Sequence, residues 1–167
     1  MNYHNITTDD MLNGSGLRVV LWCSGCTCHC KNCQNPQTWD FDSGIPFDDE
    51  AMNEICNELN KPYISGLTLS GGHPLEYRNL STINKIVSYV KDRYPDKNIW
   101  LYTGLNYEDI SQDTQMMEVV KQCDVLVDGQ YIEELKDVNM PWCGSLNQRV
   151  IDIQKTIDSE DIIQYTE

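Results

Sequence analysis

The sequence predicts an α/β fold, a partial (β/α) barrel of about six mostly parallel strands. Short apolar stretches that end in turn residues alternate along the chain with stretches whose apolar residues recur at helical spacing. This alternation is typical of right-handed βαβ units and a parallel sheet. A complete eight-fold barrel takes about 250 residues, and this chain has 167. We therefore expect part of a barrel, in a single domain that spans residues 1–167.

Four apolar stretches predict the strands. They are "LRVVLW" (17–22), "GLTLSGGHP" (66–74), "NIWLYTG" (98–104) and "DVLVDGQ" (124–130). The last three run into turns that contain glycine, and ligands of parallel sheets bind at the carboxyl ends of the strands. These turns are therefore candidate binding segments.

Three stretches predict helices, at residues 47–60, 80–94 and 111–122. The first begins with acidic residues and then spaces Met52, Ile55 and Leu59 along one face, which is typical of an amphipathic helix. The final residues, 150–167, are acidic and only weakly patterned, so we predict a tail there.

Charge and hydropathy exclude several classes of partner. The chain carries 26 acidic and 12 basic residues, a formal net charge of -14, which repels nucleic acid and anionic lipid. It has no apolar run near the roughly 20 residues of a membrane span, and its first residues lack the pattern of a signal peptide. We therefore expect a cytoplasmic protein with reduced thiols, which binds neither nucleic acid nor a membrane.

Five of the eight cysteines lie within residues 23–33, and such clusters in reduced proteins usually bind metal. One interpretation is a zinc site made by Cys23, Cys26, Cys30 and Cys33, although two ligand pairs so close together would form one strained loop. The other uses Cys26-x3-Cys30-x2-Cys33. Three thiolates at this spacing can hold three irons of a [4Fe-4S] cluster and leave the fourth iron without a protein ligand.

Cys-x3-Cys-x2-Cys on a loop after the first strand resembles the signature of the radical S-adenosylmethionine (SAM) superfamily. The resemblance extends over nearly the whole chain up to Val150. The stretches "MNYHNIT", "NGSGLRVVLWCSGC", "CQNPQTWDFDSGIPF", "GLTLSGGHPL", "IWLYTG", "LVDGQY" and "WCGSLNQRV" resemble, in order and spacing, the activating enzymes of anaerobic ribonucleotide reductase.

The resemblance implies a mechanism. Cys26, Cys30 and Cys33 would ligate the [4Fe-4S] cluster, and SAM would bind the open iron. Reductive cleavage of SAM, with an electron donor such as flavodoxin or ferredoxin, would then produce a glycyl radical on the large subunit of the reductase. The SAM contacts that we expect are Asn32, Cys33, Gln34, Gly71, Gly72 and Thr103.

The chain also departs from the family pattern. His73 stands where an acid usually follows Gly-Gly, and Gln34 replaces an aromatic residue. Gln130 and Cys143 replace a Lys and an Arg. Glu76 is a candidate to supply the carboxylate that is missing at position 73. Two alternatives stay open, the activation of another glycyl-radical enzyme and a non-catalytic zinc-binding scaffold.

Overall fold

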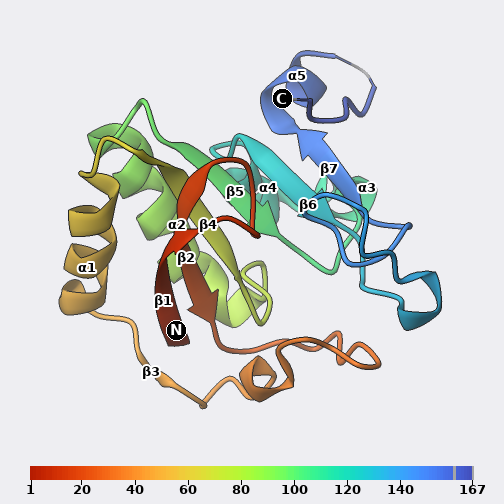
Figure 1. Ribbon diagram of the computed structural model, residues 1–167, viewed down its shortest axis with the longest axis horizontal. Helices are drawn as coiled ribbons and strands as arrows, with labels where there is room; N and C mark the ends of the chain where they lie inside the picture. The colour runs from red at the N-terminus through yellow and green to blue at the C-terminus, as the bar shows by residue number, and fades with distance from the viewer. Residues whose placement is uncertain (160, 167) are drawn as a thin grey trace.

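The computed structural model describes residues 1–159 and 161–166, and its centre is one seven-stranded sheet (Figure 1). The strand order is β3-β1-β2-β4-β5-β6-β7. The strands β2, β4, β5 and β6 run parallel, and β1, β3 and β7 are antiparallel to their neighbours. Their bounds are β1 (Asn2–Asp10), β2 (Leu17–Cys23), β3 (Ile45–Pro46), β4 (Ile64–Gly71), β5 (Asn98–Tyr102), β6 (Val125–Asp128) and β7 (Arg149–Asp152).

The predicted α/β class with parallel strands at its centre is confirmed. The parallel strands β2, β4, β5 and β6 overlap the four predicted stretches, although β4 begins before its stretch, at Ile64, and β2 ends after its stretch, at Cys23. The sheet is open, with β3 and β7 at its two edges. Residues 150–167 were predicted to be a weakly patterned tail. In the structure, β7 and the following helix occupy residues 149–158, because β7 completes the sheet by pairing with β6.

Helices accompany the sheet, and all but the last of them connect its parallel strands. They are α1 (Asp49–Leu59), α2 (Tyr77–Arg93), α3 (Tyr107–Ile110), α4 (Thr114–Val120) and α5 (Ile153–Asp158). Three start at an aspartate cap, because Asp48 accepts a hydrogen bond from the Ala51 N–H, Asp113 accepts from the N–H groups of Gln115 and Met116, and Asp152 accepts from the Lys155 N–H. No helix among residues 1–159 and 161–166 is long and apolar enough to cross a membrane.

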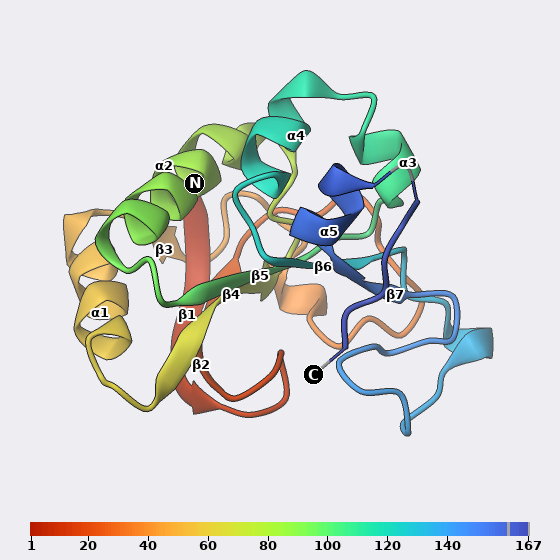
Figure 2. The same ribbon diagram turned by 90° about the horizontal axis from the view of Figure 1, so that it is seen from above.

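The two faces of the sheet differ. One face is covered by helices, and the main apolar core lies between them and the strands, with Leu21, Leu69, Leu101 and Ile83 fully buried (Figure 2). The turn between β1 and β2 and the loop that follows β6 lie on the other face. Because loops rather than helices cover this second face, it can carry a cavity.

A buried arginine lies at one end of this second face. The Arg18 guanidinium is fully buried and donates to Thr68 Oγ1 at 2.6 Å, Asn98 Oδ1 at 2.7 Å and the Leu67 carbonyl at 2.8 Å. Burial lowers the pKa of Arg18 to about 10, so the group stays charged at neutral pH. These bonds satisfy a charge that would otherwise be costly to bury.

Candidate functional site

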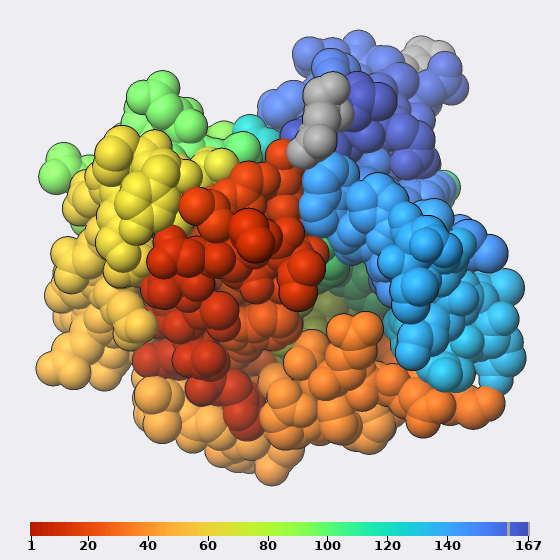
Figure 3. Space-filling view, in the orientation of Figure 1, coloured from red at the N-terminus to blue at the C-terminus, as the bar shows by residue number. Residues whose placement is uncertain are grey.

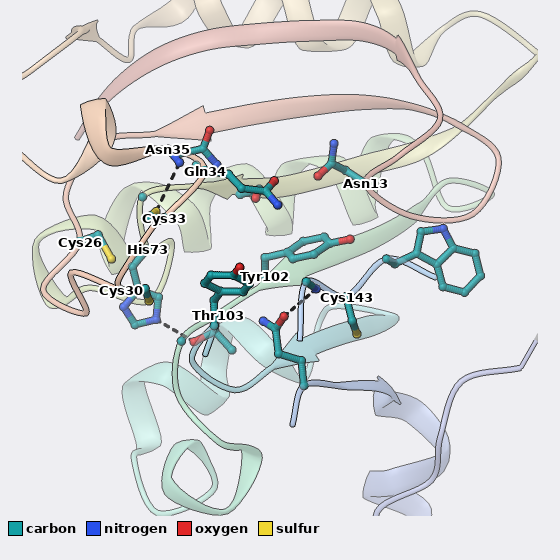
Figure 4. Close-up of a pocket in the computed structure, with 18 of the residues that line it drawn as sticks. Asn13, Cys26, Cys30, Cys33, Gln34, Asn35, His73, Tyr102, Thr103 and Cys143 are labelled. Atoms are coloured by element: carbon teal, nitrogen blue, oxygen red, sulfur yellow. Dashed lines mark hydrogen bonds between the residues drawn. The ribbon is translucent and has the colours of Figure 1, made fainter. Parts of the chain in front are cut away.

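A cavity of about 700 Å³ opens on the face of the sheet that the helices do not cover. A hollow is visible there between the turn after β1, the cysteine loop and the loop after β6 (Figure 3). Cys26, Cys30 and Cys33 lie toward one end, and Asn13 and Cys143 lie toward the other (Figure 4). The cavity falls in the size range of small-molecule sites.

The cysteine loop, residues 23–33, follows β2 directly. Its start is held by backbone hydrogen bonds, from the Gly25 N–H to the Thr38 carbonyl at 2.7 Å and from the Cys26 N–H to the Trp39 carbonyl at 3.1 Å. Farther along, His29 and Asn32 have positive φ angles of 43° and 55°. The loop thus folds back on itself and presents Cys26, Cys28, Cys30 and Cys33 to one cavity.

Thiol chemistry differs from one position to the next. The interaction between the neighbouring Cys26 and Cys28 thiols lowers the pKa of Cys26 and raises the pKa of Cys28. Burial raises the pKa of Cys30 and raises that of Cys23 to about 12. Cys23 is not among the cavity residues, since its thiol donates to the Ser70 carbonyl at 3.1 Å.

The donor set fits a cluster better than a single ion. Within residues 1–159 and 161–166, no three Cys, His, Asp or Glu side chains converge so as to hold one metal ion. Each thiolate that binds an iron–sulfur cluster ligates a different iron, so three cluster ligands need not converge on one point. Cys26, Cys30 and Cys33 meet this looser requirement, because all three line the same part of the cavity.

The ends of β4 and β5 supply another wall. Gly71, Gly72, His73 and Thr103 line the cavity, as the positions of the strand ends predict. A Cβ at Gly72 would lie 2.6 Å from the Gly25 carbonyl oxygen, and one at Gly71, whose φ is 99°, would lie 2.7 Å from the Cys23 nitrogen. Glycine is needed here because the start of the cysteine loop packs against this turn.

Comparison with known proteins reveals the family. Residues 12–151 match the family described as 4Fe-4S single cluster domain. Three similar proteins are anaerobic ribonucleoside-triphosphate reductase-activating proteins. The one from Enterobacteria phage T4 is 44% identical over 150 residues, 90% of this chain and 93% of the relative. The Haemophilus influenzae protein is 42% identical (89% and 96% covered), and the Escherichia coli K12 protein is 40% identical (90% and 97% covered).

The chain belongs to the family of anaerobic ribonucleoside-triphosphate reductase-activating proteins. The family resemblance inferred from the sequence motifs is thereby confirmed. In this member of the family, the match to the 4Fe-4S domain includes the whole of the cysteine loop.

The predicted SAM contacts do not all reach the cavity. Cys33, Gln34, Gly71, Gly72 and Thr103 line it. Asn32, which is exposed and has a positive φ, is not among the cavity residues.

Several cavity residues of this family member were not predicted from the sequence. They include Trp39 and Tyr102, whose Nε1 and hydroxyl group are buried and have no hydrogen-bond partner within the described part of the chain. A third is Asn35, whose N–H donates to the Cys33 sulfur at 3.3 Å. The strand alternation that puts Trp100 and Tyr102 on one face of β5 was the available signal for Tyr102. No sequence signal pointed to Asn35 or Trp39.

The structure shows what surrounds the residues that depart from the family pattern. Gln130 donates from Nε2 to the Cys28 carbonyl at 3.0 Å, so it contacts the cysteine loop. Cys143 lines the end of the cavity away from the three cysteines, and burial raises its pKa to about 11. His73 is buried beside Thr103. Glu76 does not line the cavity, and its carboxylate faces the cysteine loop at Thr27.

Proposed function

We propose that this protein holds a [4Fe-4S] cluster through Cys26, Cys30 and Cys33, binds SAM at the open iron, and generates the glycyl radical of an anaerobic ribonucleoside-triphosphate reductase. It would thus be a radical SAM activating enzyme with the partial-barrel fold of that superfamily. The relatives are named as activating proteins of this reductase.

One observation carries the proposal. Three thiols at the x3 and x2 spacing line a cavity that also contains the ends of two parallel strands. The volume of about 700 Å³ suits a ligand the size of SAM together with a cluster. When bound, the two groups would supply a one-electron cleavage of the sulfonium, and the carbon radical so formed would remove a hydrogen atom from a glycine.

The residues of the chain would bind, orient and shield these groups. Gly71 and Gly72 lie beside the cysteine loop and present backbone to the cavity, where no side chain would block an amino acid group. Gln34 and Thr103 add polar side chains on opposite walls. Trp22 and Trp39 add aromatic surface, which helps to exclude water from a reactive site.

The open side of the cavity is the expected route for the substrate glycine. The sheet is not closed, and the cavity mouth lies between the turn after β1 and the loop after β6. Met11 and Leu12, on that turn, are 71% and 80% exposed, so apolar side chains stand at the mouth. We propose that a glycine-bearing segment of the large reductase subunit enters here.

The test is a radical assay with the partner. The reconstituted protein, SAM and a reductant such as reduced flavodoxin are mixed anaerobically with the large subunit of the reductase, and electron paramagnetic resonance (EPR) spectra are recorded. We expect an organic radical on the reductase whose hyperfine splitting collapses when its glycines carry deuterium. The absence of a radical with the wild-type protein, or a splitting that deuterated glycine leaves unchanged, would contradict the proposal.

The zinc scaffold receives less support than the cluster. It requires Cys23 as a fourth ligand, and the Cys23 thiol is buried against the Ser70 carbonyl outside the cavity. Activation of a different glycyl-radical enzyme is tested by the same radical assay with other partners, and the names of the relatives favour the reductase.

A further inference from the structure

A chain of hydrogen bonds runs from the cysteine loop to the end of β5. The Glu76 Oε1 atom accepts from the Thr27 N–H at 2.8 Å and from the Thr27 hydroxyl at 2.7 Å. The same oxygen lies 3.3 Å from His73 Nδ1. His73 Nε2 lies 2.7 Å from the Thr103 hydroxyl oxygen, which also accepts from the Leu105 N–H at 3.1 Å.

The Glu76 carboxylate determines which His73 nitrogen carries a proton in this chain of hydrogen bonds. An ionised carboxylate only accepts hydrogen bonds, so His73 Nδ1 must carry a proton to bond with Glu76. This bond, together with the shorter one between Nε2 and the Thr103 hydroxyl group, fixes the rotation of the imidazole ring. His73 is 4% exposed and lines the cavity together with Thr103. Glu76 therefore orients a side chain that faces the ligand, although it does not line the cavity itself.

Glu76 occupies the cap position of α2, but its side chain does not cap the helix. It is the residue before α2, and its side chain makes no capping hydrogen bond. Capping residues ordinarily use their side-chain oxygen to satisfy the first N–H groups of the helix. Here the carboxylate turns to the cysteine loop instead, so its contribution is to the loop rather than to α2.

The contact matters because Thr27 lies between Cys26 and Cys28 in a stretch of irregular backbone. Other side chains that hold this stretch do so less firmly. The Lys31–Glu134 ion pair is exposed on both sides, at 69% and 64%, and such pairs are weak. Gln130 makes one uncharged hydrogen bond to the Cys28 carbonyl. Glu76 makes two hydrogen bonds to one residue, and both are strengthened by its charge.

We propose that Glu76 is a positioning residue that clamps the cysteine loop at Thr27 and sets the orientation of His73 toward the ligand in the cavity. The inference deepens the proposed function, since the clamped loop carries Cys26 and the oriented ring would face SAM. It also removes Glu76 as a direct ligand of the SAM ammonium group.

The first test uses the protein without cluster or SAM, so it does not depend on the proposed function. Hydrogen exchange of the Thr27 amide is measured by nuclear magnetic resonance in wild type, Glu76→Ala, Glu76→Gln and the control Glu118→Ala, which alters an exposed residue of α4. We expect Glu76→Ala to speed exchange by roughly tenfold, the equivalent of one charge-assisted hydrogen bond. Glu76→Gln keeps an acceptor oxygen and should restore most of the protection.

A second variant tests the same contact from the loop. Thr27 is exposed, so Thr27→Val removes its hydroxyl group without disturbing the buried His73. We expect faster exchange of the residue 27 amide, by less than in Glu76→Ala. If the residue 27 amide exchanges at the wild-type rate in both Glu76→Ala and Thr27→Val, the proposal that Glu76 clamps the loop is wrong.

The third test addresses His73 with a spectroscopic readout. In the reconstituted protein, we expect the SAM concentration that gives half of the EPR change to rise about tenfold in Glu76→Ala and to stay within about twofold of wild type in Glu76→Gln and Glu118→Ala. An equal loss in Glu76→Gln and Glu76→Ala would instead indicate that the charge itself meets SAM, and would overturn the positioning role. If the wild type takes up no cluster, the proposed function is wrong. The hydrogen-exchange measurements still test whether Glu76 holds the cysteine loop at Thr27.

Discussion

At the scale of single residues, the site separates cysteines that face the cavity from those that do not. Cys26, Cys30 and Cys33 line the cavity, whereas Cys23 is buried against the Ser70 carbonyl and Cys123 is fully buried in the core. This placement agrees with the cluster interpretation, in which Cys23 is not a ligand. The cluster and zinc interpretations therefore predict opposite effects of single cysteine substitutions on metal binding.

We predict that Cys23→Ala keeps the bound metal and that Cys30→Ala loses it. Cys23 reaches no cavity ligand, so its loss removes only packing, whereas Cys30 would be one of three cluster ligands. Iron, sulfide and zinc are measured per chain after anaerobic reconstitution, with Cys123→Ala as the control for loss of a buried thiol. Loss of metal in Cys23→Ala with retention of zinc in the wild type would instead support the scaffold.

Tyr102 offers a second test at this scale. Its hydroxyl group is buried in the cavity wall and has no hydrogen-bond partner within residues 1–159 and 161–166. Burial raises its pKa, so the group stays protonated and can donate to a ligand. Such an unpaired group is costly in the free protein and becomes useful only when a ligand fills the cavity.

We therefore expect Tyr102→Phe to leave the free energy of unfolding of the ligand-free protein unchanged or raised by up to about 1 kcal/mol. SAM binding to the reconstituted protein should weaken by roughly tenfold. Urea denaturation and calorimetric titration measure the two effects, with Tyr63→Phe, at an exposed position, as the control. A destabilised protein with unchanged SAM affinity would show that the hydroxyl has an internal partner.

At the scale of elements, the end of β4 and the start of the cysteine loop form one unit. The Gly72 N–H donates to the Cys23 carbonyl at 2.8 Å, and the His73 N–H donates to the Gly25 carbonyl at 2.8 Å. Both glycines that were predicted as SAM contacts therefore have a packing role as well, because the loop backbone lies against them.

Gly72→Ala should move the cysteine loop. The added methyl group would lie 2.6 Å from the Gly25 carbonyl oxygen, and backbone rather than a flexible side chain must yield. We expect a loss of about 1–3 kcal/mol in the free energy of unfolding and weaker SAM binding after reconstitution. Gly144→Ala is the control in the same cavity, because its methyl group would meet the Tyr131 ring, which can turn. Equal effects of the two substitutions would contradict the account of the glycine turn.

The link between the cysteine loop and α2 also predicts a pH dependence. Hydrogen bonds from His73 and Thr27 lower the pKa of Glu76 to about 2, from an ordinary value of 4.5. A lowered folded-state pKa means that the stabilisation by the ionised group is complete above pH 4.5 and is lost as the pH falls toward 2. Urea denaturation between pH 7 and pH 2 should show this decline in wild type and a smaller one in Glu76→Gln. Identical profiles would mean that Glu76 makes no net bond in the folded state.

At the scale of the whole molecule, the sequence predicted the centre of the fold better than its edges. The parallel strands β2, β4, β5 and β6 are buried and β-branched, so their apolar runs are easy to recognise. β1 was not predicted, because an antiparallel strand near the edge of the sheet carries many polar residues. β7 is only four residues long and is specified by its pairing with β6, a tertiary contact that local pattern does not encode.

The candidate site was likewise predicted only in part from the sequence. The cysteine spacing, the glycine turn and Thr103 are local features, and they were predicted from sequence and found on the cavity wall. The exposed position of Asn32 and the contact between Glu76 and Thr27 depend on how the cysteine loop folds back. Such loop geometry arises from contacts between segments far apart in the chain, which neither spacing nor periodicity reveals.

The central claim is that Cys26, Cys30 and Cys33 hold a [4Fe-4S] cluster with one iron open to SAM. The most direct measurement is low-temperature EPR of the anaerobically reconstituted, dithionite-reduced protein before and after SAM is added. The account predicts a reduced-cluster signal that shifts with SAM and that is absent in Cys30→Ala. A protein that takes up no cluster and retains zinc, or a cluster signal that SAM leaves unchanged, would contradict it.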